Sequence, residues 1–305
     1  MRRQDVFQLE DHVTYIRRLV EQGGPRGRDF SELDYWIVDV RTAIQTGTLS
    51  DSELAEIRAA FGDALSPATM QGFAFTKPHG YAGDFEIIDR MYQMYVSSDS
   101  RLAGWDRFFH QHAAAKAVRN RKTYFHRLLD RHSVRKQPLR VLKIASGPGR
   151  SMYEWLCAYP HAAVTVECIE IDRNAIDYAS HLNERFLDRI TFVRKNALRY
   201  RPSNKYDLIW AAGIVDYFDD RVFMSLLKRL MPAVADGGEI VIGNFSDNNP
   251  SRAYMELLGG WHLHHRTGDH LRRLARDCGI APDQISVGTE PERVNLFLHV
   301  LPDRK

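Results

Sequence analysis

The sequence predicts an α/β protein in which a helical half precedes a seven-stranded sheet. From about residue 140 onward, short apolar runs alternate with helical stretches, as they do in a parallel sheet covered by crossover helices. Before that point, apolar residues recur at three- and four-residue spacing, which is typical of amphipathic helices. With 305 residues, 44% of them apolar, the chain exceeds one average domain and can bury a sizeable core.

The N-terminal half contains four predicted helices and one loop. Ser31 and Asp51 are expected to cap the second and third helices, because their side chains can accept hydrogen bonds from free backbone N–H groups. Residues 72–85 contain three glycines and a proline and follow no period, so we expect a loop there. The predicted helices are residues 6–21, 31–47, 51–65 and 101–132.

The C-terminal half contains seven predicted strands and four predicted helices. The helix over residues 221–234 should end at Asp236-Gly-Gly238, since glycine often ends helices. We expect a helical domain over residues 1–139 and a sheet domain over residues 140–305. The strands are expected at 140–145, 164–171, 190–193, 206–212, 239–245, 284–288 and 293–301, and the other helices at 151–158, 174–186 and 268–278.

Composition and charge exclude several classes of partner. The formal charge of +3 is small and the basic residues are scattered, so nucleic acid is not expected; the densest basic segment, residues 131–140, is interpreted as an interdomain linker. No apolar stretch approaches the roughly 20 residues that span a bilayer, and the N-terminus does not resemble a signal peptide. Three widely spaced cysteines indicate reduced thiols and a cytoplasmic location.

A Gly-x-Gly turn joins the first predicted strand of the sheet to a helix and predicts a nucleotide-sized site. Gly147 and Gly149 form this turn, and Glu170 follows about twenty residues later, where its carboxylate can accept hydrogen bonds from ribose hydroxyls. A dinucleotide site needs a third glycine where Met152 stands, and no Gly-Lys-Ser/Thr segment is present to hold a triphosphate. An adenosine cofactor other than NAD is therefore expected, with an ordinary strand-to-helix turn as the alternative and a dehydrogenase as the weakest one.

Five segments in order and spacing resemble those of class I S-adenosylmethionine-dependent methyltransferases. The resemblance implies a Rossmann-like seven-stranded methyltransferase sheet with an N-terminal helical lid domain, and S-adenosyl-L-methionine as the cofactor. It extends from residue 140 through residue 245 and onward to the end of the chain. The segments are Ile144-Ala-Ser-Gly-Pro-Gly-Arg150, Glu170-Ile-Asp-Arg173, Lys195-Asn-Ala197, Tyr206-Asp-Leu-Ile-Trp210 and Asp236-Gly-Gly-Glu-Ile-Val-Ile242.

The same resemblance implies roles for individual residues. Glu170 would hold the ribose, Ile171 would lie against the adenine, and Asn196 would meet the adenine amino group. Ala197 is a further candidate for cofactor binding. The family usually has an acidic residue where this chain has Lys143, and an aspartate is common at the position of Asn196. The methionine part would be faced by Ala145, Ser146, Gly147 and Gly149, and the methyl donor would be bordered by Ala211 to Gly213.

Two further segments resemble a narrower group, the bacterial methyltransferases that make 3-hydroxy fatty acid methyl ester (quorum-signal) molecules. They are Lys77-Pro-His-Gly-Tyr-Ala-Gly-Asp84 and Trp261-His-Leu-His-His-Arg-Thr267. This resemblance implies that Tyr81 and Asp84 come from a helical lid that helps to close over the cofactor.

The residues after the fourth strand of the sheet bear on the methyl acceptor. Adenine and glutamine N-methyltransferases carry an Asn/Asp-Pro-Pro-Tyr/Phe motif there, whereas this chain has Ala211-Ala-Gly-Ile-Val-Asp-Tyr217, so methylation of a base or an amide is not expected. Asp216 and Tyr217 are candidates for the lining of an acceptor pocket. The alternative is that they are a helix cap and a core residue.

A cationic cluster follows the fifth strand and is the second candidate for acceptor binding. Arg266 could hold an anion with two parallel hydrogen bonds, beside His262, His264 and His265. His262 and His264 share a face of an extended segment, but no cysteine or nearby carboxylate completes a metal site, so no metal is expected. Ordinary surface polarity is the other interpretation.

These observations together predict a small-molecule methyltransferase. We expect O-methylation of a carboxylate or hydroxyl of a lipid-like or other secondary metabolite, with Arg266, Asp216, Tyr217 and His264 as the catalytic candidates. The alternatives are an N-methyltransferase of an amine or heterocycle and a non-catalytic S-adenosylmethionine-binding regulator. A homodimer is left open.

Overall fold

The computed structural model describes residues 8–135 and 137–302 and divides into two compact units. The helical unit comprises residues 1–115 and 250–262, and the sheet unit comprises residues 116–249 and 263–305. These units differ from the predicted domains 1–139 and 140–305. The physical reason at the first boundary is that apolar side chains after residue 116, Phe125, Leu128 and Leu129, are buried in the same cluster as the sheet.

The helical unit consists mainly of short helices around aromatic side chains. The rings of Trp36 and Phe61 lie 6.1 Å apart between centroids, and those of Phe61 and Trp105 lie 5.3 Å apart. All three side chains are buried. The helices are α1 (Leu9–Glu21), α2 (Phe30–Gln45), α3 (Asp51–Ala60), α4 (Met70–Thr76), α5 (Phe85–Tyr92), α6 (Ala103–Gln111) and α11 (Arg252–Gly259).

Both predicted helix caps in this unit are wrong by one or two residues. Ser50, not Asp51, precedes α3, where its Oγ accepts a hydrogen bond from the Glu53 N–H and the Glu53 carboxylate accepts one from the Ser50 N–H at 2.8 Å. This reciprocal pair satisfies two free donors at the helix start. Asp29, not Ser31, precedes α2. The predicted loop over 72–85 begins within α4, so only its later part is irregular.

The single helix predicted over residues 101–132 is two helices, α6 and α7 (Ala113–Arg135), which separate at His112. His112 has extended backbone angles, and its Nδ1 is hydrogen-bonded to the Phe108 carbonyl at 2.8 Å. Its ring stacks on Tyr254 of α11, a helix that was not predicted, with centroids 3.8 Å apart. The break is therefore stabilised by contacts that are remote in sequence.

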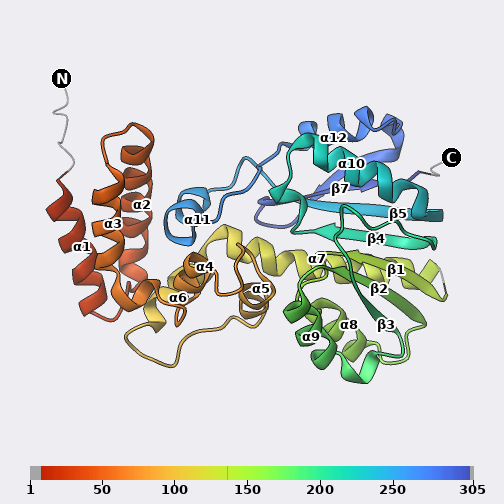
Figure 1. Ribbon diagram of the computed structural model, residues 1–305, viewed down its shortest axis with the longest axis horizontal. Coiled ribbons are helices and arrows are strands. Elements are labelled where there is room, and N and C mark those ends of the chain that lie inside the picture. Colours follow the sequence, from red (N-terminus) through yellow and green to blue (C-terminus); the bar gives the residue numbers. More distant parts are fainter. Residues whose placement is uncertain (1–7, 136, 303–305) are drawn as a thin grey trace. The chain divides into compact units, whose positions relative to one another are not determined.

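The sheet unit has the predicted seven strands, in the order β3-β2-β1-β4-β5-β7-β6 (Figure 1). The first five strands pair in parallel, and β7 pairs antiparallel with both β5 and β6. The expected fold class is thereby confirmed. The strands are β1 (Leu139–Ile144), β2 (Val164–Glu170), β3 (Ile190–Arg194), β4 (Tyr206–Ala212), β5 (Val234–Phe245), β6 (Ile285–Thr289) and β7 (Asn295–Val300).

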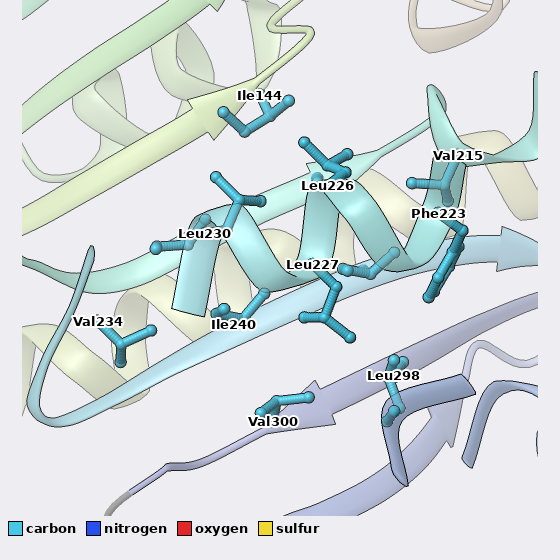
Figure 2. Packing of buried hydrophobic residues seen from close by; sticks show 14 of the residues in the cluster. Ile144, Val215, Phe223, Leu226, Leu227, Leu230, Val234, Ile240, Leu298 and Val300 are labelled. Carbon is cyan, nitrogen blue, oxygen red and sulfur yellow. The ribbon is translucent and has the colours of Figure 1, made fainter. Parts of the chain in front are cut away.

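Both faces of the sheet are buried, as is usual for parallel strands. In β4, Ile209 and Ala211 belong to one apolar cluster while Leu208 and Trp210 belong to the other, because successive side chains point to opposite faces. Figure 2 shows part of the first cluster, in which helix α10 (Asp220–Leu230) packs on β5 and β7. The remaining helices of the unit are α8 (Arg150–Ala158), α9 (Arg173–Leu182) and α12 (Gly268–Asp277).

Candidate active site

The strand order places a ligand site at the carboxyl ends of β1 and β4. These two strands are neighbours, yet β1 is followed in the chain by β2 on one side and β4 by β5 on the other. Loops that leave such a point diverge, and ligands of open α/β sheets bind in the resulting crevice. The Gly-x-Gly turn follows β1 directly, so it lies at this point.

Three residues of the glycine turn have left-handed backbone conformations. They are Ala145 (φ 51°), Gly147 (φ 59°) and Gly149 (φ 72°). Left-handed geometry at a residue with a Cβ, such as Ala145, costs roughly 1–3 kcal/mol and occurs often at functional sites. A Cβ added at Gly147 would meet no atom within 4 Å, so this side of the turn is open and fits a ligand.

Gly149 has a different neighbour. A Cβ there would lie 2.9 Å from the Ala179 Cβ and 2.8 Å from the Asn183 Nδ2, both of which belong to α9 or its end. The need for glycine at position 149 therefore comes from the close packing of α9 against the turn. Its expected contact with the methionine part of the cofactor stays a prediction.

The two glycines can be separated by alanine substitution. Gly149→Ala is expected to lower the free energy of unfolding by about 1–3 kcal/mol more than Gly147→Ala, since both pay for the left-handed backbone but only Gly149→Ala overlaps α9. Gly147→Ala should in turn weaken S-adenosylmethionine binding more, because its Cβ occupies the open side. Urea unfolding and calorimetric titration measure the two effects; equal stability losses would contradict the packing role of Gly149.

The Glu170 carboxylate connects the end of β2 to the glycine turn by a hydrogen bond. Its Oε2 accepts a hydrogen bond from the Gly147 N–H at 3.0 Å, and its Oε1 accepts bonds from the N–H groups of Ile171 and Asp172 at 2.8 and 3.2 Å. Since a carboxylate oxygen can accept two hydrogen bonds, Oε2 retains capacity for a ribose hydroxyl. Ile171 beside it is 57% exposed, which leaves its side chain available to an adenine ring.

Lys143 of β1 stabilises the glycine turn through hydrogen bonds. Its Nζ donates hydrogen bonds to the Ser151 Oγ at 2.7 Å and to the Ser146 carbonyl at 3.2 Å, and it lies 5.5 Å from the centre of the Phe125 ring. Burial lowers the pKa of this ammonium to about 8. Lys143 is thus accommodated by the β1–α8 connection itself. The side chain of Ser146 is also buried.

The predicted adenine-binding residues follow β3. The Asn196 Oδ1 accepts a hydrogen bond from the Leu198 N–H at 2.8 Å, and Ala197 is buried in the core. The amide oxygen of Asn196 is therefore already engaged in a local turn, which sequence reasoning did not foresee. A contact with the adenine amino group stays a prediction.

Asp216 links three segments at the exit of β4. Its Oδ1 accepts a hydrogen bond from the Phe245 N–H at 2.6 Å, and its backbone carbonyl accepts one from the His264 N–H at 2.7 Å. Burial raises the pKa of this carboxyl to about 6. Among the neighbouring candidates, Ala211 is fully buried in β4, whereas Tyr217 is 37% exposed.

Arg266 does not have the expected form of an anion clamp. Its side chain is 2% exposed, and its guanidinium already donates hydrogen bonds to four acceptors: Asp220 Oδ1 at 3.0 Å, Asn244 Oδ1 at 2.6 Å, and the carbonyls of Val215 and Phe218 at 3.3 and 2.5 Å. A two-pronged contact with a substrate carboxylate would require some of these bonds to break. Arg266 is instead a positioning residue for the loops after β4 and β5.

A polar hollow of about 480 Å³ opens beside this guanidinium. His270 Nε2 lies 2.7 Å from the second oxygen of Asp220, and His264 is exposed. The hollow could accommodate part of a small polar acceptor. Its lining residues are Asp219, Asp220, Arg221, His264, His265, Arg266 and His270.

Tyr81 and Asp84 belong to the helical unit. Asp84 precedes α5, where its Oδ1 accepts hydrogen bonds from the N–H groups of Glu86 and Ile87, both at 2.9 Å. Burial raises the pKa of its carboxyl. Tyr81 is 39% exposed. The structure gives Asp84 a capping role, and the expected role of both residues in a lid stays a prediction.

Within the described residues, no helix combines the length and apolar character that a membrane crossing needs. The cytoplasmic location that the sequence indicates stays an expectation, and whether the protein forms a homodimer stays open.

Comparison with known proteins agrees with this site. Residues 141–238 match a family model described as a methyltransferase domain. A search of curated proteins finds no significant match. Among solved structures, a protein from Bordetella parapertussis described as a possible exported protein is 19% identical, with a TM-score of 0.65 over 99% of each chain. The S-adenosylmethionine-dependent methyltransferase SibL is 16% identical, with a TM-score of 0.52 over 86% of this chain and 77% of SibL.

These structural likenesses, at such low identity, concern the fold. The family match covers the glycine turn, Glu170 and the exit of β4, which are the parts that the geometry brings to the carboxyl edge of the sheet. Over residues 141–238, the chain therefore carries a methyltransferase domain.

Proposed function

We propose that the chain transfers the methyl group of S-adenosylmethionine to an oxygen of a small, lipid-like or other secondary metabolite. The observation that carries the cofactor part is the hydrogen bond from the Gly147 N–H to Glu170 at the switch point of the sheet. It places an open turn beside a carboxylate that can still accept a hydrogen bond, which fits an adenosine with an extended side chain.

Methyl transfer from a sulfonium is an in-line displacement, so positioning and exclusion of water supply most of the catalysis. The bound cofactor supplies the electrophilic methyl group. Glu170 and the glycine turn would hold the adenosine, while Asp216 keeps the segment at His264 in place through its carbonyl. The exposed Tyr217 and His264 are the proposed acceptor contacts.

For the acceptor itself, two features support an oxygen nucleophile. The exit of β4 lacks the Asn-Pro-Pro-Tyr type of motif. The hollow beside Arg266 is lined by imidazoles, which can accept the proton of a hydroxyl, together with two guanidinium groups and the carboxylates of Asp219 and Asp220. The resemblance of residues 77–84 and 261–267 makes a 3-hydroxy fatty acid the first acceptor to test. A helical lid formed by residues 1–139 and a cytoplasmic site of action belong to the same proposal.

The pH dependence of the rate distinguishes the acceptor classes. With a carboxylate acceptor, whose pKa is about 4–5, we expect the rate to stay nearly constant from about pH 7 upward, because no proton has to leave. A hydroxyl or amine acceptor would instead give a rate that rises through neutral pH. The assay is formation of S-adenosylhomocysteine by the full chain with 3-hydroxy fatty acids, alkyl alcohols and alkyl amines, each followed by mass spectrometry of the methylated product.

Two results would count against the proposal. Methylation confined to amines would replace it with N-methylation. Tight cofactor binding with no product from any acceptor or from a cell extract would favour a non-catalytic regulator.

A further inference from the structure

Arg121 is a buried cation at the candidate site that has no hydrogen-bond or ion-pair partner among the described residues. Arg121 of α7 is 6% exposed, and its charge acts on the Asp216 carboxyl without a hydrogen bond or an ion pair to that residue or to any other described one. A guanidinium offers five N–H donors and stays charged at all physiological pH values. Since a buried charge is costly unless it is paired, this arginine calls for an anion from outside the chain.

The guanidinium lies at the exit of β4. A Cβ placed on Gly213 would be 2.9 Å from the Arg121 Nη1 and 3.4 Å from its Cζ and Nη2, so the glycine leaves the space that the guanidinium fills. Gly213 has a φ of 100°, a conformation that favours glycine independently. The close approach of Arg121 to Gly213 thus places a charged group against the backbone where β4 ends.

Two other buried cations near this edge, Lys143 and Arg266, are engaged with protein acceptors. Lys143 is held by Ser146 and Ser151, and Arg266 by its four acceptors. The charge of Arg121 favours the ionised form of the nearby Asp216 carboxyl, but the two side chains do not form an ion pair. The free donors of Arg121 are therefore the natural partners of an incoming anion at this edge.

We propose that Arg121 binds the carboxylate of the methionine part of S-adenosylmethionine. This inference rests on the proposed function. The lateral order of the strands supports it: Glu170 ends β2, Gly147 follows β1, and Gly213 follows β4. Two strand spacings, roughly 10 Å, separate the β2 and β4 positions, which is comparable to the reach from a ribose to the carboxylate of an extended methionine chain.

A carboxylate could also arrive on the methyl acceptor, and ligand pairs distinguish the two sources. S-adenosylhomocysteine carries the amino-acid carboxylate, whereas 5′-methylthioadenosine has the same adenosine and sulfur without it. Calorimetric titration of the full chain with both ligands needs no turnover. We expect Arg121→Gln to weaken binding of S-adenosylhomocysteine by roughly 10- to 100-fold through lost charge-assisted hydrogen bonds, and to leave methylthioadenosine binding unchanged.

Two further variants complete the experiment. Arg121→Lys keeps the charge but loses the two-pronged geometry, so its affinity for S-adenosylhomocysteine should lie between those of the wild type and Arg121→Gln. Arg127→Gln, at an exposed arginine of the same helix, should change neither affinity. Unchanged methylthioadenosine binding also reports that each variant is folded.

The opposite results are equally specific. If Arg121→Gln leaves the ratio of the two affinities as in the wild type, Arg121 does not bind the cofactor carboxylate and an acceptor carboxylate becomes its partner. A parallel loss for both ligands, in Arg121→Lys as well, would make the role structural. If the wild-type protein binds neither ligand, the proposed function itself fails.

Discussion

Arg266→Met is expected to lower the free energy of unfolding of the sheet unit by about 3–5 kcal/mol, because it removes the donor group of a buried network. Methionine approximates the length of the arginine stem but supplies no hydrogen bond. The Asn244 Oδ1 and the Phe218 carbonyl would lose their donor, and the Val215 carbonyl would keep only the Phe218 N–H. Of its two described side-chain partners, Asp220 would keep His270. Urea-induced unfolding followed by tryptophan fluorescence measures the loss.

Arg272→Met is the matched control for this prediction. Arg272 lies on α12, is partly exposed, and pairs with a carboxylate of Asp269 that is 92% exposed, so its loss should cost well under about 1 kcal/mol. If Arg266→Met is as stable as the wild type but has a much larger KM for the acceptor, Arg266 binds the acceptor anion, as the sequence analysis expected. A joint loss of stability and activity would agree with a positioning role.

The case of Arg266 shows why the cationic cluster could not be interpreted from the sequence. Its residue types suggested an anion site, but two of its acceptors are backbone carbonyls, which carry no sequence signal. Asp220 and Asn244 are 46 and 22 positions away in the chain. The sequence analysis did not identify Arg121 as a site residue, because only the fold brings this helical arginine close to Gly213.

The cofactor side of the site was more accessible to sequence reasoning. Glu170 and the glycine turn are adjacent in any parallel pairing of β1 with β2, so their relation follows from strand order alone. Gly149 was harder: a glycine that a ligand needs and a glycine that a helix needs look identical in sequence. The packing of Ala179 against it distinguishes the two.

In the fold, too, features set by local sequence were predictable and features set by long-range contacts were not. Alternating apolar runs identified all seven strands, because burial on both faces is a local property of each segment. The break at His112 and helix α11 depend on contacts between residues that are far apart in sequence, such as the stack of His112 on Tyr254. The helix caps were predicted one or two residues away from their true positions, since several neighbouring residues have side-chain oxygens that can cap a helix.

The last prediction concerns Glu239, a carboxylate in β5 that is 2% exposed on its side chain. It accepts hydrogen bonds from Arg131 and from His132 Nε2 at 2.9 Å through one oxygen, and from His299 Nδ1 through the other. Burial alone would raise the pKa of this carboxyl, but the hydrogen bonds from His132 and His299, together with the charges of His299 and Arg131, outweigh it and lower the pKa well below its usual value.

A carboxyl whose pKa is lowered by folding stabilises the folded state above its unfolded pKa, here about 4.5, and this contribution is lost as the pH falls toward the folded value. Glu239→Gln should therefore lower the free energy of unfolding by about 3–5 kcal/mol at pH 7, since the donors around it lose their charged acceptor. The difference in unfolding free energy between the wild type and Glu239→Gln should narrow below about pH 4.5.

Glu154→Gln is the control: it removes a partly exposed partner of Lys122 and should lower the free energy of unfolding by less than about 1 kcal/mol at every pH tested. Urea unfolding at pH 7, 5 and 3.5 provides the comparison. A gap of constant size across these pH values would mean that Glu239 contributes through packing and not through its charge.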